Sequence, residues 1–220
     1  MKYVMAFGTG DRGSRHPVED DSTRESISEE CRDAALSFMT GVGEGWDKLD
    51  LALWLTGGYA RATRHSKHGE RVATPVLAVA EIPEPTLENL VVHVRGQLLA
   101  SLEMAALGLG ALDFADAMVE RALVRRMIDA DGRDAWVPVD GARMRLRDRV
   151  ESLFAADYLN APYTYAEMFV CPRCETVVFD AHAKQVGICG THRISGTAPR
   201  TVPREGDTPV EHSSNESNVG

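Results

Sequence analysis

Residues 86–107 read TLENLVVHVRGQLLASLEMAAL, and this stretch determines the class of the fold. One set of apolar side chains has the spacing of a single α-helix face: Leu87, Leu90, Val91, Val94 and Leu98. A second set makes the helix apolar on more than one side: Leu99, Leu102, Ala106 and Leu107. Other elements have to cover a helix of this kind, so the pattern predicts a central core helix that Thr86 caps.

Flanking segments also have helical apolar spacing. The spacing predicts further helices over residues 27–39, 47–57, 112–128 and 148–159. Ser26 and Glu29 form a capping-box pattern before the first of them, and Asp47 is the expected cap of the second. The sequence therefore predicts an α+β protein with a predominantly helical core domain over residues 26–160.

Within the core, an Asp140-Gly141 dipeptide separates two runs that lack helical spacing. Asp-Gly is a preferred two-residue hairpin turn, because a type I′ turn needs positive φ at both central positions. Apolar and basic residues alternate in the second run, which predicts a β-hairpin at residues 135–147 with one basic face. That face carries Arg143, Arg145 and Arg147.

The three arginines allow two interpretations. Helices followed by a basic hairpin have the order of a winged helix-turn-helix, whose wing arginines contact DNA phosphates or the minor groove. Alternatively, the arginines pair with acidic neighbours such as Asp148 and Glu151 on an ordinary exposed surface. Composition favours the second interpretation, because the expected folded core is not basic overall.

A metal-binding pattern lies near the C-terminus. Cys171-Pro-Arg-Cys174 is followed, after fourteen residues, by Cys189-Gly-Thr-His192. Two such pairs can place three thiolates and one imidazole around a single Zn²⁺, and four ligands of this kind fill a structural zinc shell. There are three alternatives. The four residues have this spacing by chance, or Cys171 and Cys174 are a redox pair beside an unrelated Cys189 and His192, or His182 replaces His192 as the fourth ligand.

The two pairs resemble the knuckles of the zinc-ribbon class, over about residues 164–196 only. Residues 167–170, 176–180 and 185–188 are strand-like, as a ribbon requires. One departure is Glu175, which stands where many ribbons have a glycine after the second ligand. The expected cofactor is therefore structural Zn²⁺, held in a small C-terminal ribbon.

Composition limits the class of protein. The 220 residues are 44% hydrophobic and 26% charged, as in a globular protein, while polar residues dominate the expected disordered tails at 1–25 (acidic) and 197–220. No apolar run reaches the ~20 residues of a membrane span, and no signal-peptide pattern is present. These features predict a cytoplasmic protein without a membrane partner.

The function expected from these features is that of a zinc-binding regulatory or adaptor protein. Its helical core would present the ribbon to a macromolecular partner, either a protein or DNA. The alternative is an enzyme with an unrecognised active site and a structural ribbon. No residue is assigned a catalytic or cofactor-binding role, because the sequence contains no complete catalytic motif.

Overall fold

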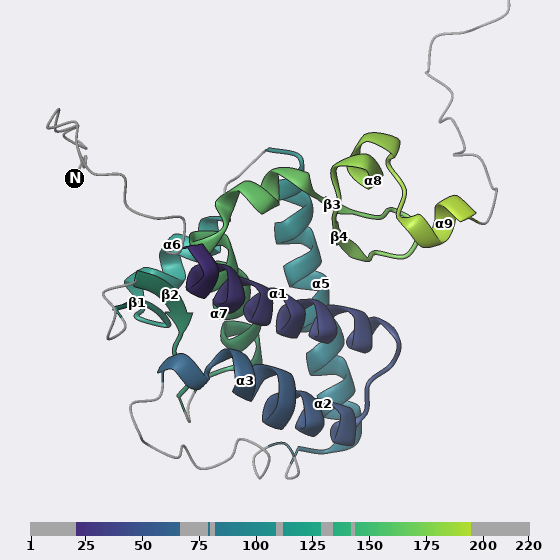
Figure 1. Cartoon of the computed structure of the whole chain (residues 1–220). Helices are drawn as coiled ribbons and strands as arrows, with labels where there is room; N and C mark the ends of the chain where they lie inside the picture. Colours follow the sequence, from purple (N-terminus) through teal and green to yellow (C-terminus); the bar gives the residue numbers. More distant parts are fainter. Residues whose placement is uncertain are drawn as a thin grey trace, which may run out of the picture.

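The computed structural model describes residues 21–66, 79, 82–108, 112–128, 134–141 and 144–194 (Figure 1). Its helices are α1 (Asp21–Gly43), α2 (Lys48–Trp54), α3 (Ala60–Ala62), α5 (Glu84–Ala106), α6 (Asp113–Glu120), α7 (Leu146–Asn160), α8 (Ala181–Val186) and α9 (Gly190–Ile194). Its strands are β1 (Val124–Ile128), β2 (Asp134–Pro138), β3 (Met168–Val170) and β4 (Val177–Phe179). These strands form two small antiparallel hairpins, which confirms the expected α+β class with a predominantly helical core.

Helices α1 and α7 pack along each other at the centre of the core. The side chains of Phe38 on α1 and of Leu153 and Phe154 on α7 are completely buried there. Helix α5 packs against both, while α6 and the β1–β2 hairpin pack against α7. The segment from β3 to α9 lies beside α5, away from the β1–β2 hairpin (Figure 1).

Helix α5 confirms the predicted core helix, but the predicted Thr86 cap is wrong, because the helix begins at Glu84 after Pro83 and Thr86 lies inside its first turn. Apolar side chains from both predicted sets are buried along it: Leu87, Val91, Val94, Leu98, Leu99 and Leu102. Asp47 is confirmed as the cap of α2, because its carboxylate accepts hydrogen bonds from the backbone N–H groups of Leu49 and Asp50, at 2.7 and 3.0 Å.

The predicted helix end at Gly57-Gly58 is wrong. A π-helical turn, Leu55–Tyr59, continues from α2 into α3. The continuation places the ring of Tyr59 against that of Trp54, with 5.3 Å between the ring centroids, and buries Tyr59 almost completely. Burial of a large aromatic side chain outweighs the low helix propensity of two glycines.

The N-terminal boundary also differs from the prediction. Helix α1 begins at Asp21, so residues 21–25 of the expected tail are helical and Ser26 lies inside the helix. Arg24 explains the longer helix, because its guanidinium pairs with the Asp134 carboxylate and donates to the Asp134 carbonyl oxygen on β2. Residues 1–20 and 197–220 lie outside the described residues.

The helix predicted at residues 112–128 is correct only in its first half. Helix α6 ends at Glu120, and Ala122 then takes a left-handed conformation with φ +55°. The chain reverses there and continues as β1, whose Val124 is buried against the core. Apolar spacing alone does not reveal this reversal.

The hairpin predicted at residues 135–147 is wrong, because β2 pairs with the preceding strand β1 and not with the following residues. The carboxylate of Asp140 pairs with the guanidinium of Arg149, which also donates to the carbonyl oxygen of Gly141 at 2.9 Å. Asp140 and Gly141 are therefore held against α7, and the chain enters that helix at Leu146.

A matched pair of glycine substitutions tests the packing of α1. A Cβ atom at Gly41 would overlap the indole of Trp46, whereas one at Gly96 on α5 would meet open space. We expect Gly41→Ala to lower the free energy of unfolding by about 1–3 kcal/mol, as overpacking does. Gly96→Ala should raise it by about 0.5–1 kcal/mol, because alanine favours the helix.

Urea denaturation of both variants measures these changes. Equal stability of Gly41→Ala and the parent protein would contradict the placement of the Trp46 ring against α1.

Candidate metal centre

The first ligand pair lies on the β3–β4 hairpin. Cys171 follows β3 directly, and its backbone N–H donates to the Thr176 carbonyl oxygen at 2.9 Å. The N–H of Glu175 donates back to the Cys171 carbonyl oxygen at 2.8 Å, which closes the knuckle. Glu175 has φ +54°, the conformation for which many ribbons use glycine. Its carboxylate pairs with Arg95 of α5 at 2.7 Å, and this contact ties the knuckle to the core.

The second pair lies at the start of a helix, which differs from the prediction. Helix α8 includes Gln185 and Val186 of the segment expected as a strand. The Asp180 carboxylate caps α8 by accepting from the N–H groups of His182 and Ala183, and Gly187 ends it with φ +76°. Cys189 then precedes α9, which carries His192. The site thus joins one β-hairpin knuckle to one helix start, whereas the resemblance implied strands at both.

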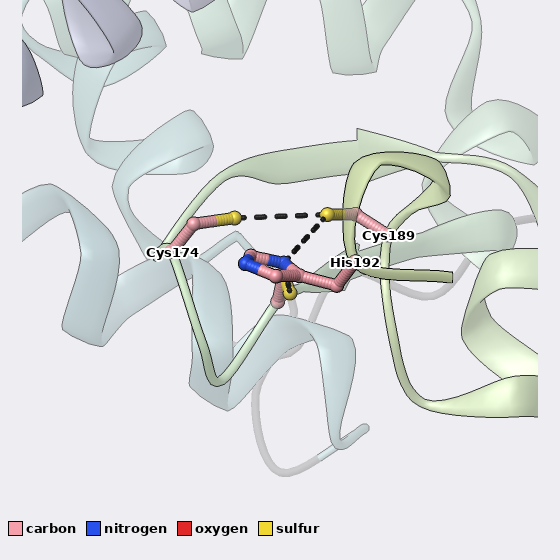
Figure 2. A group of neighbouring side chains, drawn as sticks. Cys174, Cys189 and His192 are labelled. Carbon is pink, nitrogen blue, oxygen red and sulfur yellow. Dashed lines mark hydrogen bonds between the residues drawn. The ribbon is translucent and has the colours of Figure 1, made fainter. Parts of the chain in front are cut away.

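The four predicted ligands lie together: Cys171, Cys174, Cys189 and His192. Their ligand atoms all lie within 4.8 Å of one another, and the labelled side chains in Figure 2 point toward a common centre. The Sγ atoms of Cys174 and Cys189 are 3.7 Å apart. The His192 Nδ1 atom lies 3.5 Å from Sγ of Cys171 and 3.2 Å from Sγ of Cys189.

These separations fit a tetrahedral zinc ion. Sulfur at about 2.3 Å and nitrogen at about 2.0 Å from zinc, at tetrahedral angles, lie about 3.8 Å (S to S) and about 3.5 Å (S to N) apart. All four cysteines of the chain, including the buried Cys31 of α1, are free thiols. Three of them, with one imidazole, form a donor set that suits zinc.

The protein also favours ionisation of one of the thiols. Burial of Cys171 opposes ionisation, but backbone N–H groups of Cys189, Arg173 and Cys174, together with the His192 ring, lower its pKa to about 6. For Cys174, burial and the neighbouring sulfurs raise the pKa, although the thiol lies at the surface and contacts the Thr176 hydroxyl. The lowered pKa prepares the Cys171 thiol to bind a metal as thiolate.

The alternative interpretations of the motif, chance spacing included, do not match this arrangement. His182 is exposed on α8 and does not belong to the cluster, whereas His192 does. Cys189 and His192 lie beside the Cys171–Cys174 pair, so they are not unrelated to it.

Two of the three arginines assigned to the basic hairpin belong to the N-terminal end of α7, and Arg143 lies outside the described residues. Arg145 precedes the helix and pairs with Asp148 at 3.2 Å. Arg147, in the first turn, pairs with Glu151 at 2.6 Å and donates to the side chain of Gln97 at 2.9 Å. The interpretation that the arginines pair with acidic neighbours is therefore confirmed for Arg145 and Arg147.

A buried network that the sequence analysis missed positions the first knuckle. Asp157 of α7 is completely buried and accepts hydrogen bonds from Ser28 and Arg32 of α1 and from the Tyr165 hydroxyl, the last at 2.8 Å. Burial and the nearby Asp157 raise the pKa of Tyr165 well above its ordinary value, so the phenol stays protonated and donates. Tyr165 lies on a 3-10 turn, Pro162–Glu167, that leads into β3.

This network therefore fixes the strand that precedes Cys171. The signal in the sequence is a carboxylate on the apolar face of α7, three and four residues after Phe154 and Leu153.

Comparisons with protein-family models, with curated proteins and with solved structures found no match. Among the helices of the described residues, none combines the length and the apolar character that crossing a membrane requires.

Proposed function

We propose that the protein binds one Zn²⁺ through Cys171, Cys174, Cys189 and His192, and that the ion has a structural role. The observation that carries the proposal is the approach of all four ligand atoms to within 4.8 Å of one another. Four protein ligands fill a tetrahedral zinc shell, whereas a catalytic zinc keeps a position open for water or substrate. The ion supplies a cross-link between the β3–β4 knuckle and the start of α9.

We further propose that the β3–α9 segment, here called the metal module, acts as an adaptor surface for a macromolecular partner. The module lies on one side of the helical core (Figure 1). The side chain of Val186 on α8 is exposed. Residues 168–194 contain two acidic and three basic side chains. One net positive charge is far less than the positive charge that dominates DNA binding, which favours a protein partner.

Metal content gives the direct test of the site. We expect one zinc per chain after dialysis against a weak chelator, and Co²⁺ substitution should give the intense sulfur-to-metal charge-transfer absorption of thiolate ligands. His192→Ala should weaken metal binding by at least about 100-fold, because it opens the shell.

Two matched variants serve as controls for that test. His182→Ala changes an exposed histidine of the same module, and Cys31→Ser changes a buried cysteine of the core. Both should retain one zinc. Equal zinc loss in His182→Ala and His192→Ala, or a chain without bound zinc, would overturn the proposal.

The partner is tested by photo-cross-linking from position 186 in cells, with position 53 on α2 as an exposed control site. The adaptor role predicts a discrete protein adduct from position 186 that disappears in the Cys189→Ser background. An adduct to nucleic acid at position 186 would favour DNA, and identical adducts from both positions would contradict a role of the module.

A further inference from the structure

A cleft of about 740 Å³ lies on the helical core, between α5, α6 and the start of α7. Its volume is within the range of sites for small organic ligands. Its lining includes apolar side chains, of which Val94 and Met118 are buried and Phe114 is partly exposed. It also includes polar side chains from the start of α7, together with Arg121 after α6.

Two carboxylates at the base of the cleft hold its three arginines in place. The side chain of Asp148 is only 7% exposed and pairs with Arg121 at 3.0 Å and with Arg145 at 3.2 Å. The side chain of Glu151 is 4% exposed and pairs with Arg147. The arginine side chains extend outward, and that of Arg145 is 78% exposed. Buried acids thus orient guanidinium groups that still face solvent.

The charge of the cleft favours an anion. Among the described lining residues, three arginines and two carboxylates leave one net positive charge, and the only other titratable side chain is that of His93. The positive end of the α7 dipole adds to this potential. Within the described part of the chain, Arg145 uses only its Nε atom in the ion pair, so its Nη groups can donate to a ligand.

We propose that this cleft binds a small organic anion that carries an oxyanion group on an apolar body. The oxyanion, a carboxylate or a phosphate ester, is held by Arg145 with Arg121 and Arg147. The apolar body lies against Val94, Phe114 and Met118. Oriented guanidinium groups recognise planar or tetrahedral oxyanions because they donate paired hydrogen bonds, and an apolar wall adds affinity for the attached chain.

The test is calorimetric titration of the full-length, zinc-loaded protein with four probes: octyl phosphate, octanoate, 1-octanol and inorganic phosphate. We expect at least one of the first two to bind, and octanol and inorganic phosphate to bind at least about tenfold more weakly, since each lacks one of the two recognised parts. The ratio of the affinities for octyl phosphate and octanoate then decides whether the preferred oxyanion is a phosphate ester or a carboxylate.

Arg145→Gln should weaken binding of the preferred probe by about tenfold or more, because a charge-assisted hydrogen bond is lost. This exposed side chain can be changed without disturbing the core. Arg61→Gln, at an exposed arginine of α3 outside the cleft, is the matched control and should bind like the parent.

Three results would overturn the proposal. These are no heat with either charged amphiphile, equal affinity for octanol and octanoate, or equal weakening by Arg61→Gln and Arg145→Gln. Binding of a short DNA duplex that Arg145→Gln abolishes, without binding of either amphiphile, would assign the arginines to nucleic acid instead.

Discussion

Chelation of the metal is expected to unfold residues 171–194 and to leave α1, α5 and α7 folded. Zinc binding to small structural sites is worth about 10–16 kcal/mol, far more than the few buried side chains of this segment can supply. In the described part of α8, α9 and their connection, the buried apolar side chains are Ala183, Ile188 and Cys189. Without the ion, nothing else of comparable strength joins α9 to the knuckle.

Strand β3, which precedes the ligands, is expected to stay folded after chelation. Met168 of β3 is completely buried and belongs to the same core cluster as α1 and α7, and β3 packs against α5. We therefore expect the metal-dependent unit to begin near Cys171, inside the predicted ribbon at residues 164–196. The division of the chain into a core at 26–160 and a ribbon at 164–196 stays a prediction, which this experiment measures.

Hydrogen exchange followed by mass spectrometry locates the change. Peptides from residues 171–194 should lose protection after chelation, whereas peptides from α7 should keep it. Cys31→Ser, which leaves all four ligands in place, is the control for reagent effects and should behave like the parent. Loss of protection throughout α1 and α7 would show instead that the module and the core fold as one unit.

The metal ligands were predictable because their signal is local. Each pair has the spacing that closes one turn around an ion, so the ligands of a pair need no distant contact to come together. Helix α5 was predictable for a related reason, because its apolar periodicity extends over many turns. Which element carries the second pair was not predictable, since residues 185–188 are short and helix α8 depends on the Asp180 cap and the left-handed Gly187.

Strand β1 shows why the other errors arose. Val124–Ile128 continues the apolar spacing of α6, and its identity as a strand depends on the turn at Ala122 and on pairing with β2. The pairing with β2 joins residues that are distant in sequence, so local apolar periodicity does not predict it.

At the start of α7, two patterns in the sequence indicate different structures. In residues 143–147, arginines alternate with apolar residues, and this pattern is typical of a β-strand. Arg145 with Asp148 and Arg147 with Glu151, however, have the i,i+3 and i,i+4 charge spacing of a helix. In this segment, charge spacing indicates the structure better than alternation does.

Asp157→Ala is expected to lower the free energy of unfolding by about 3–5 kcal/mol, because it removes the acceptor at the centre of a buried network. The Arg32 guanidinium would lose an ion pair of 2.9 Å, and the hydroxyls of Ser28 and Tyr165 would lose their shared acceptor. Urea denaturation of the zinc-loaded protein measures the change. Asp33→Ala, at an exposed acid on the same helix as Arg32, should stay within about 0.5 kcal/mol of the parent.

A second variant separates the loss of an ion pair from the loss of packing. Replacing Ser28, Arg32 and Asp157 together with Ala, Met and Leu removes the charges and fills the space, and it should recover much of the stability lost in Asp157→Ala. The Tyr165 hydroxyl also donates to the carbonyl oxygen of Phe154 at 3.1 Å, so it keeps an acceptor in this variant. If the triple variant is no more stable than Asp157→Ala, the network matters for the position of Tyr165 before β3 rather than for the balance of buried charge.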